Sequence, residues 1–388
     1  MTTTMAPQIA ARPLGAVAQA GMFVFGIVMA LVGAVVPPLS ERLAIALGDV
    51  GTLFLAMNFA MLVASLVLGL IVDRFGLKLP LASGPALVAL GLVLIGRAGE
   101  YAQLIPAVVA LGFGGGFVNG AANTLVADLH DDEQRKAAAL NLLGMFFGFG
   151  ALFLPFSIGA LTSTFGIAAL LYAAAALCAA TAIAAAALTF PPPKQRQGWP
   201  LARMPQFLGM PVVLLLGLLL FFLSGNEFTL GGYISTHLTR EMGLSIGAAS
   251  YALGGYWAAL MATRAVLSRV LLRVSPHTVV LAGALVSAAA ALLVAAAPAQ
   301  GVAVAGVVLL GLALSGLFPT VLGIASARFR ENSGTVFGIL FTIALSGGMT
   351  MPWVAGQLAE GFGVGAAFVL AAANFVAIAL IGLVVRRS

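Results

Sequence analysis

Long apolar runs occupy most of this chain, and no other feature restricts its fold as strongly. A helix needs about 20 mostly apolar residues to cross the hydrocarbon core of a bilayer. Hydrophobic residues make up 62% of the chain and charged residues 8%, whereas about a quarter of the residues in a soluble domain are charged. We therefore predict an all-α membrane protein whose twelve transmembrane helices lie near residues 16–39, 49–72, 79–97, 102–126, 138–160, 166–189, 211–236, 245–268, 277–297, 301–326, 334–358 and 364–385.

The positions of lysine and arginine predict the orientation of these helices. With an even number of spans, both termini lie on the same side of the membrane. If that side is the cytoplasm, the outer segments hold only Arg42, Arg97 and Arg240, and every other Lys or Arg except Arg264 lies inside. Cytoplasmic loops carry the excess of cations. We expect a multi-pass protein of the cytoplasmic (inner) membrane with both termini cytoplasmic, in contact with lipids and not with nucleic acid.

An internal repeat divides the chain into halves. The stretch "LPFSIGALTSTFG" at 154–166 corresponds to "MPWVAGQLAEGFG" at 351–363, and a proline-rich, cationic segment separates the halves. The sequence predicts two six-helix bundles, 1–190 and 211–388, joined by a cytoplasmic linker, 191–210. The alternative is that glycine and proline recur because membrane helices tolerate them. The identical pairs are Gly150/Gly347, Pro155/Pro352, Gly159/Gly356, Leu161/Leu358, Phe165/Phe362 and Gly166/Gly363.

Two charged residues fall deep within predicted spans, Glu227 and Arg264. A charge at the centre of a membrane helix costs roughly 2.5–3.5 kcal/mol, so it normally faces a bundle interior or a water-filled cavity. We predict that Glu227 faces a cavity, the alternative being a hydrogen bond that only ties helices together. A rise of about 1.5 Å per residue separates the two charges by roughly 15 Å along the membrane normal, so we expect Arg264 to brace the cytoplasmic mouth instead of pairing with Glu227.

Several polar and aromatic residues are candidates for substrate contacts. Asn226 and Tyr233 share one helix face, as do Asn119 and Asn123. Such groups suit a hydroxylated or otherwise polar solute, although asparagine also serves as an interhelical tie. Tyr256, Trp257 and Trp353 lie within spans, where their rings line a cavity or pack along a helix seam.

The sequence contains no constellation typical of an enzyme. His130, His237 and His277 lie in loops or at span ends, and Cys178 is the single cysteine. We therefore expect no catalytic residues, no metal site and no cofactor.

The segment "GLIVDRFGLK" resembles the G-x-x-x-D-R-x-G-R-[RK] signature of the major facilitator superfamily. It matches at Gly69, Asp73, Arg74, Gly76 and Lys78, and Leu77 stands where an Arg is usual. The resemblance implies a monomeric transporter that works by alternating access, in which this loop acts with Arg264 as a gate. Asp73 is then expected to accept from the positive amino terminus of the eleventh span.

Shorter motifs resemble the fucose/glucose/galactose permease branch of that superfamily. These are "SGNEFTLGGYISTHL" around Glu227, "FPT" at 318–320 and "AANT" at 121–124. The resemblance implies symport of a sugar or related compound with a proton.

Gly33 and Asn119 stand where fucose-type members have acids. Coupling therefore falls to Glu227, to another ion such as sodium, or to none, as in a passive carrier. The rival prediction is a proton-coupled multidrug or metabolite efflux antiporter, although "GFGALFLPFSIG" lacks the Gly-Pro step usual in those exporters.

Overall fold

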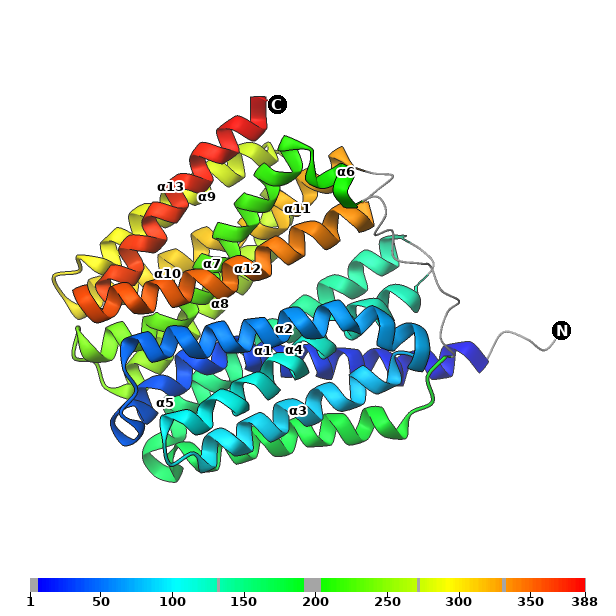
Figure 1. Cartoon of the computed structure of the whole chain (residues 1–388), viewed down its shortest axis with the longest axis horizontal. Helices are drawn as coiled ribbons and strands as arrows, with labels where there is room; N and C mark the ends of the chain where they lie inside the picture. Colours follow the sequence, from blue (N-terminus) through cyan, green and yellow to red (C-terminus); the bar gives the residue numbers. More distant parts are fainter. Residues whose placement is uncertain (1–5, 131–132, 192–203, 271–272, 330–332, 388) are drawn as a thin grey trace. The chain divides into compact units, whose positions relative to one another are not determined.

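The computed structural model describes residues 6–130, 133–191, 204–270, 273–329 and 333–387, and Figure 1 shows them as an assembly of helices. Within these ranges no strand occurs, and one turn of 3-10 helix, Tyr101–Gln103, precedes α4. The predicted all-α class is therefore confirmed. The helices are α1 (Ala6–Leu43), α2 (Leu47–Phe75), α3 (Lys78–Arg97), α4 (Leu104–Asp128), α5 (Glu133–Ala187), α6 (Met204–Leu208), α7 (Pro211–Arg240), α8 (Ile246–Val270), α9 (Pro276–Ala295), α10 (Gln300–Leu314), α11 (Leu317–Arg328), α12 (Ser333–Phe362) and α13 (Gly365–Arg387).

The helices have the length and composition of membrane spans. Ten stretches of the described chain are long and apolar enough to cross a bilayer. One of them, Ala138–Ala187, has 50 residues, which is enough for two crossings. The helix α8, which contains Arg264, is not among the ten. The predicted membrane-spanning architecture is thus confirmed at ten to twelve helices.

Two details of the helices differ from the predicted spans, for identifiable reasons. The predicted fifth and sixth spans, 138–160 and 166–189, lie in the stretch Ala138–Ala187, in which α5 stays helical through 161–165 and breaks at Gly166, whose φ of 74° suits glycine. The predicted tenth span, 301–326, corresponds to the single stretch Gln300–Arg328, whose helix is interrupted at Ser315–Gly316. Pro319 explains this second break, because it lacks the N–H that would bond to the Ser315 carbonyl and its ring crowds that group.

By internal contacts the chain divides into two compact units. The amino-terminal unit comprises Met1–Leu31, Arg42–Ala44 and Phe59–Gln197, and the carboxyl-terminal unit comprises Val32–Glu41, Ile45–Asn58 and Gly198–Ser388. The carboxyl-terminal unit therefore includes parts of α1 and α2. The division 1–190, 191–210 and 211–388 stays a prediction, and residues 192–203 of the predicted linker lie outside the described ranges.

The two units repeat one close helix contact. In the amino-terminal unit, a methyl group placed on Gly150 of α5 would lie 1.9 Å from the Phe23 carbonyl oxygen of α1. In the carboxyl-terminal unit, a methyl on Gly347 of α12 would lie 1.9 Å from the Phe221 carbonyl oxygen of α7. These glycines form one of the pairs that predicted the internal repeat. In a second pair, Gly166 and Gly363 both have a positive φ, 74° and 84°. Both observations support a duplication.

Helix α7 is the centre of the carboxyl-terminal unit. It packs against α12, α13 and α8, while α8 also packs against α10 and α13 against α9; α7 and α12 run side by side in Figure 1. Most of α7 from Leu219 onward is buried. A polar side chain on α7 is therefore held among other helices of this unit.

Candidate functional site

Glu227 interrupts the buried surface of α7. Its neighbours Asn226 and Phe228 are 0% and 6% exposed, whereas Glu227 itself is partly exposed. Among the described residues its carboxylate has no hydrogen-bond or ion-pair partner, but it interacts electrostatically with Arg264 of α8. The carboxylate is thus held deep in the chain with its oxygen atoms available.

Arg264 is tied to the break between α10 and α11. Its Nε donates to the Ser315 carbonyl oxygen at 3.4 Å, the group that Pro319 leaves without its helical donor. The guanidinium also acts electrostatically on Tyr256 of α8. We expected Glu227 and Arg264 to be independent; the structure brings them within electrostatic range without a direct salt bridge.

Tyr256 supplies the third polar group of this cluster. The side chain is 0% exposed, and among the described residues its hydroxyl has no hydrogen-bond partner. A buried hydroxyl normally forms a hydrogen bond, since leaving it without one costs about 1–3 kcal/mol. Glu227 acts on the same tyrosine electrostatically. We call Glu227, Tyr256 and Arg264 the α7–α8 polar cluster; its chemistry is that of a site for a polar ligand.

The two predicted tryptophans differ in their surroundings. Trp257 is 1% exposed, and a methyl group on Gly231 of α7 would lie 3.3 Å from its ring. The ring also packs edge-on against Tyr256, with ring centroids 5.3 Å apart. Trp353 on α12 is 40% exposed. Trp257 therefore belongs beside the polar cluster, whereas no contact brings Trp353 to it.

Asn226 and Tyr233 have the features of structural residues. Asn226 donates to the Ala371 carbonyl oxygen at 3.1 Å and accepts from Asn374 Nδ2 at 2.9 Å, so both ends of its amide are engaged with α13. Tyr233 is 0% exposed and donates to the carbonyl oxygens of Leu47 and Pro352. These contacts favour the interhelical role that we kept as the alternative to substrate binding.

Asn119 and Asn123 lie together on α4 of the amino-terminal unit. Asn123 Nδ2 donates to the backbone oxygen of Asn119 at 2.8 Å and to its Oδ1 at 3.1 Å. Both residues are partly exposed. In the described chain, neither Asn119 Nδ2 nor Asn123 Oδ1 has a hydrogen-bond partner, so this pair offers one donor and one acceptor to a ligand.

The predicted gating motif forms the turn between α2 and α3. Gly76 follows the last residue of α2 and has a φ of 76°. Glycine adopts this backbone conformation without strain, whereas residues with a side chain rarely do. Asp73 is partly exposed, Arg74 and Lys78 are exposed, and the Arg74 guanidinium lies 5.2 Å from the Phe75 ring centroid. Gly69 lies within α2, so the motif is a compact cationic turn; its gating role and the partner of Asp73 remain predictions.

Two polar pairs escaped the sequence analysis. The first pair is Asn226 and Asn374, and Asn374 lies in an otherwise apolar span. The only sequence signal for this pair is that both residues lie at a similar depth in their predicted spans. His237 lies at the end of α7 as expected, but it is 1% exposed and lies against Glu241. No group of acidic, histidine and cysteine side chains in the described ranges could hold a metal ion.

Two solved structures share this fold across nearly the whole chain. A mutant of the nucleoside transporter NupG superposes with a TM-score of 0.79 at 14% identity, covering 96% of this chain and 99% of that one. A bacterial homologue of the human lysosomal transporter Spinster, in an inward-facing and occupied conformation, gives 0.77 at 15% identity, covering 98% and 97%. At these identities the likeness establishes the fold alone.

Curated relatives are similar over a short stretch. A probable vesicular acetylcholine transporter-A of Danio rerio is 27% identical over 107 residues, 28% of this chain and 21% of the relative. The vesicular acetylcholine transporter of Homo sapiens is 28% identical over 106 residues, 27% of this chain and 20% of the relative. The chain thus matches about a fifth of the length of these relatives.

A family profile covers nearly all of the sequence. The profile of the Major Facilitator Superfamily matches residues 20–226 and, a second time, residues 216–388. Two matches in succession agree with the repeated contacts at Gly150 and Gly347. With a helical fold shared with solved transporters over at least 96% of its length, the chain belongs to the Major Facilitator Superfamily, whose members are membrane transporters and not enzymes.

Proposed function

We propose that this transporter moves a small polar solute, a sugar or a related compound, by alternating access. The observation that carries the proposal is the α7–α8 polar cluster, which combines an available carboxylate, a buried hydroxyl without a partner in the described chain and a permanent cation. A hydroxylated solute offers both donors and acceptors, so it satisfies all three groups at once.

Each member of the cluster has a distinct role in this proposal. Glu227 accepts hydrogen bonds from solute hydroxyls, while the Tyr256 hydroxyl donates to a solute oxygen. Arg264, fixed by the Ser315 carbonyl, holds the charge of Glu227 in place. Trp257 packs beside them and presents an apolar surface to the C–H groups of the solute.

Asn119 and Asn123 are a separate candidate contact within the amino-terminal unit. Their amide donor and carbonyl acceptor, which have no partner in the described chain, suit hydroxyl groups of a polar solute. For Asn226 and Tyr233, which the sequence predicted as substrate contacts, we propose that they hold helices together, because hydrogen bonds within the carboxyl-terminal unit already engage them.

Coupling and placement complete the proposal. We propose a monomer in the inner membrane with both termini cytoplasmic, related in substrate class to the fucose/glucose/galactose permeases. Glu227 is the proposed proton-coupling group, because it is the carboxylate that lies on α7 beside a fixed cation. Coupling to sodium, or to no ion, follows if neutralising Glu227 leaves accumulation unchanged.

A second candidate is proton-coupled efflux of an organic cation or metabolite. The local similarity to vesicular acetylcholine transporters favours it, as does a carboxylate beside aromatic rings, which suits a cationic ligand. Arg264 argues against it, because a fixed cation next to Glu227 repels a second positive charge.

Transport by sealed proteoliposomes separates these candidates. The wild type, Glu227→Gln and Glu100→Gln are compared for uptake of labelled glucose, fucose, uridine and acetylcholine, with and without an imposed pH gradient. Glu100 is exposed and precedes the 3-10 turn, so its substitution controls for loss of one negative charge.

The pattern of uptake decides between the candidates. Sugar or nucleoside accumulation that follows the gradient, is lost in Glu227→Gln and is retained in Glu100→Gln supports proton symport through Glu227, provided that exchange of preloaded solute survives. Acetylcholine movement against the proton gradient supports efflux. Equal, gradient-independent sugar transport by all three proteins contradicts the coupling role while keeping the substrate class.

A further inference from the structure

We propose that His237 and Glu241, at the end of α7, form a proton-binding site separate from the α7–α8 polar cluster. The two residues are one helical turn apart, and His237 Nδ1 lies 2.8 Å from Glu241 Oε2. The histidine side chain is 1% exposed and the glutamate side chain 32% exposed. A buried imidazole is thus joined to a carboxylate that reaches the surface.

Both ring nitrogens of His237 face oxygen atoms. Nε2 lies 3.2 Å from the carbonyl oxygen of Val294 on α9, and a carbonyl oxygen only accepts hydrogen bonds. Nε2 therefore carries a hydrogen. In a neutral imidazole, Nδ1 then presents a lone pair, and it would face an ionised carboxylate that also only accepts.

Two acceptors at 2.8 Å repel each other unless a proton lies between them. Because His237 Nδ1 has no hydrogen-bond partner among the described residues, the 2.8 Å contact is an ion-pair approach and not an aligned hydrogen bond. The proton has two alternative positions: on the imidazole, giving imidazolium beside carboxylate, or on the carboxylate, giving neutral imidazole beside carboxylic acid. In both, the pair holds one proton more than a separated neutral histidine and ionised glutamate.

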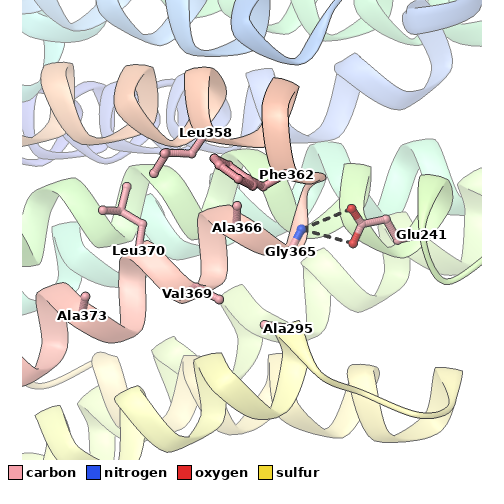
Figure 2. A pocket seen from close by; sticks show the side chains of 9 residues that line it. All are labelled: Glu241, Ala295, Leu358, Phe362, Gly365, Ala366, Val369, Leu370 and Ala373. Carbon is pink, nitrogen blue, oxygen red and sulfur yellow. Dashed lines mark hydrogen bonds between the residues drawn. The ribbon is translucent and has the colours of Figure 1, made fainter.

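Glu241 is held in place by the amino terminus of α13. Its carboxylate accepts from the backbone N–H of Val364 and, at 3.2 and 3.1 Å, from that of Gly365, as Figure 2 shows for Gly365. A helix amino terminus favours a negative charge, so imidazolium beside carboxylate is the form that this geometry supports best. The Phe368 ring of α13 lies 4.9 Å from the imidazole centroid and covers it.

Glu241 lines a cavity beside the end of α7. This cavity of about 570 Å³ is otherwise apolar, lined by Ala295, Phe362 and residues of α13 such as Val369. Figure 2 shows the Glu241 carboxylate at one end of this cavity. Of the two residues Glu241 is the more exposed, so the proposed site exchanges its proton through the carboxylate.

Two other charged side chains at this end of the unit are engaged elsewhere. Arg240, next to Glu241 on α7, donates to the Ile45 carbonyl oxygen, and Glu360 of α12 accepts from the Gly48 backbone N–H. From α9 the group that faces His237 is the Val294 carbonyl, and from α13 it is the Phe368 ring. The proton therefore joins α7, α9 and α13, and its release removes the attraction between His237 and Glu241.

Histidine labelling tests the site without measuring transport. The protein contains three histidines, so a His130→Gln/His277→Gln background with 15N-labelled histidine reports on His237 alone. Nitrogen chemical shifts are recorded in lipid nanodiscs at pH 7 for this background, for Glu241→Gln within it and for a Glu360→Gln control. Infrared difference spectra against Glu241→Gln report any protonated carboxylic acid.

The outcomes are distinct. We expect both nitrogens of His237 to be protonated in the background and in the Glu360→Gln control, and one to lose its proton in Glu241→Gln, whose amide can donate to Nδ1. One protonated nitrogen together with a carboxylic acid band that Glu241→Gln removes also supports the site. One protonated nitrogen without that band overturns it. Because no solute is involved, this result is independent of the outcome for Glu227.

Discussion

The contact between α7 and α12 leads to a quantitative prediction for Gly347→Ala. The added methyl would lie 1.9 Å from the Phe221 carbonyl oxygen, and side-chain carbons essentially never approach such an atom within 3.0 Å. The two helices must therefore separate locally by about 1.1 Å. A gap of 0.5–1 Å forfeits about a quarter to a half of each dispersion contact across the seam.

We expect Gly347→Ala to lower the free energy of unfolding by about 3 kcal/mol, at the upper end of the usual range for overpacking. The matched control is Gly338→Ala in the same helix, where nothing lies within 4 Å of the added methyl. There alanine is favoured over glycine by about 0.5–1 kcal/mol. The two variants should thus differ by about 3–4 kcal/mol.

The assay is reversible unfolding of the purified protein in mixed micelles by titration with SDS. The repeat supplies an independent comparison, because Gly150→Ala should behave like Gly347→Ala, and Gly144→Ala of α5, which also has open space, like Gly338→Ala. If Gly347→Ala is as stable as Gly338→Ala, the helices do not meet at this glycine and the argument fails.

Three further predictions concern polar contacts of the carboxyl-terminal unit. Asn226→Leu and Asn374→Leu should each lower the unfolding free energy by about 1–2 kcal/mol, and the double variant by less than the sum, because both remove one shared hydrogen bond; additivity in the SDS titration would disprove the pairing. Tyr233→Phe should lower the same free energy by about 1 kcal/mol, since it deletes the hydroxyl that donates to Leu47 and Pro352. An unchanged titration midpoint would show that those hydrogen bonds do not contribute to stability. Arg264→Met should destabilise the protein by leaving the charge of Glu227 uncompensated, and adding Glu227→Gln should restore part of the loss; absence of rescue would mean that the two residues do not interact.

The fold was largely predictable because lipid restricts the choice of structure. Apolar runs long enough to cross a bilayer must be helical, so the class and most helices followed from residue type alone. The details that hydropathy missed lie where one residue changes the backbone. Gly166 breaks α5 without an intervening loop, so the predicted boundary there is correct only to within a few residues. Pro319 lies in a run that is apolar throughout, so hydropathy does not show the interruption at Ser315–Gly316.

The site was less predictable, because depth in the membrane does not reveal which way a side chain faces. Asn226 and Glu227 are adjacent, yet the first is sealed against α13 and the second stays available. On a helix that is apolar all round, periodicity cannot separate these faces. Likewise, we predicted from a helical rise of about 1.5 Å per residue that Arg264 and Glu227 are far apart along the membrane normal. In the structure, α8 packs against α7, and the two residues lie within electrostatic range of each other.

The carbonyl freed by Pro319 has a consequence for the response of the protein to voltage. By anchoring Arg264, it fixes a permanent positive charge within electrostatic range of Glu227, so the two residues together are neutral whenever the carboxylate is ionised. A membrane potential then exerts no net force on the pair in the empty carrier or in one loaded with an uncharged solute. A proton on Glu227 leaves one net charge, and moving one charge across the whole membrane at 100 mV is worth about 2.3 kcal/mol. As far as these two residues are concerned, voltage is thus expected to act on the form protonated at Glu227 and not on the ionised form.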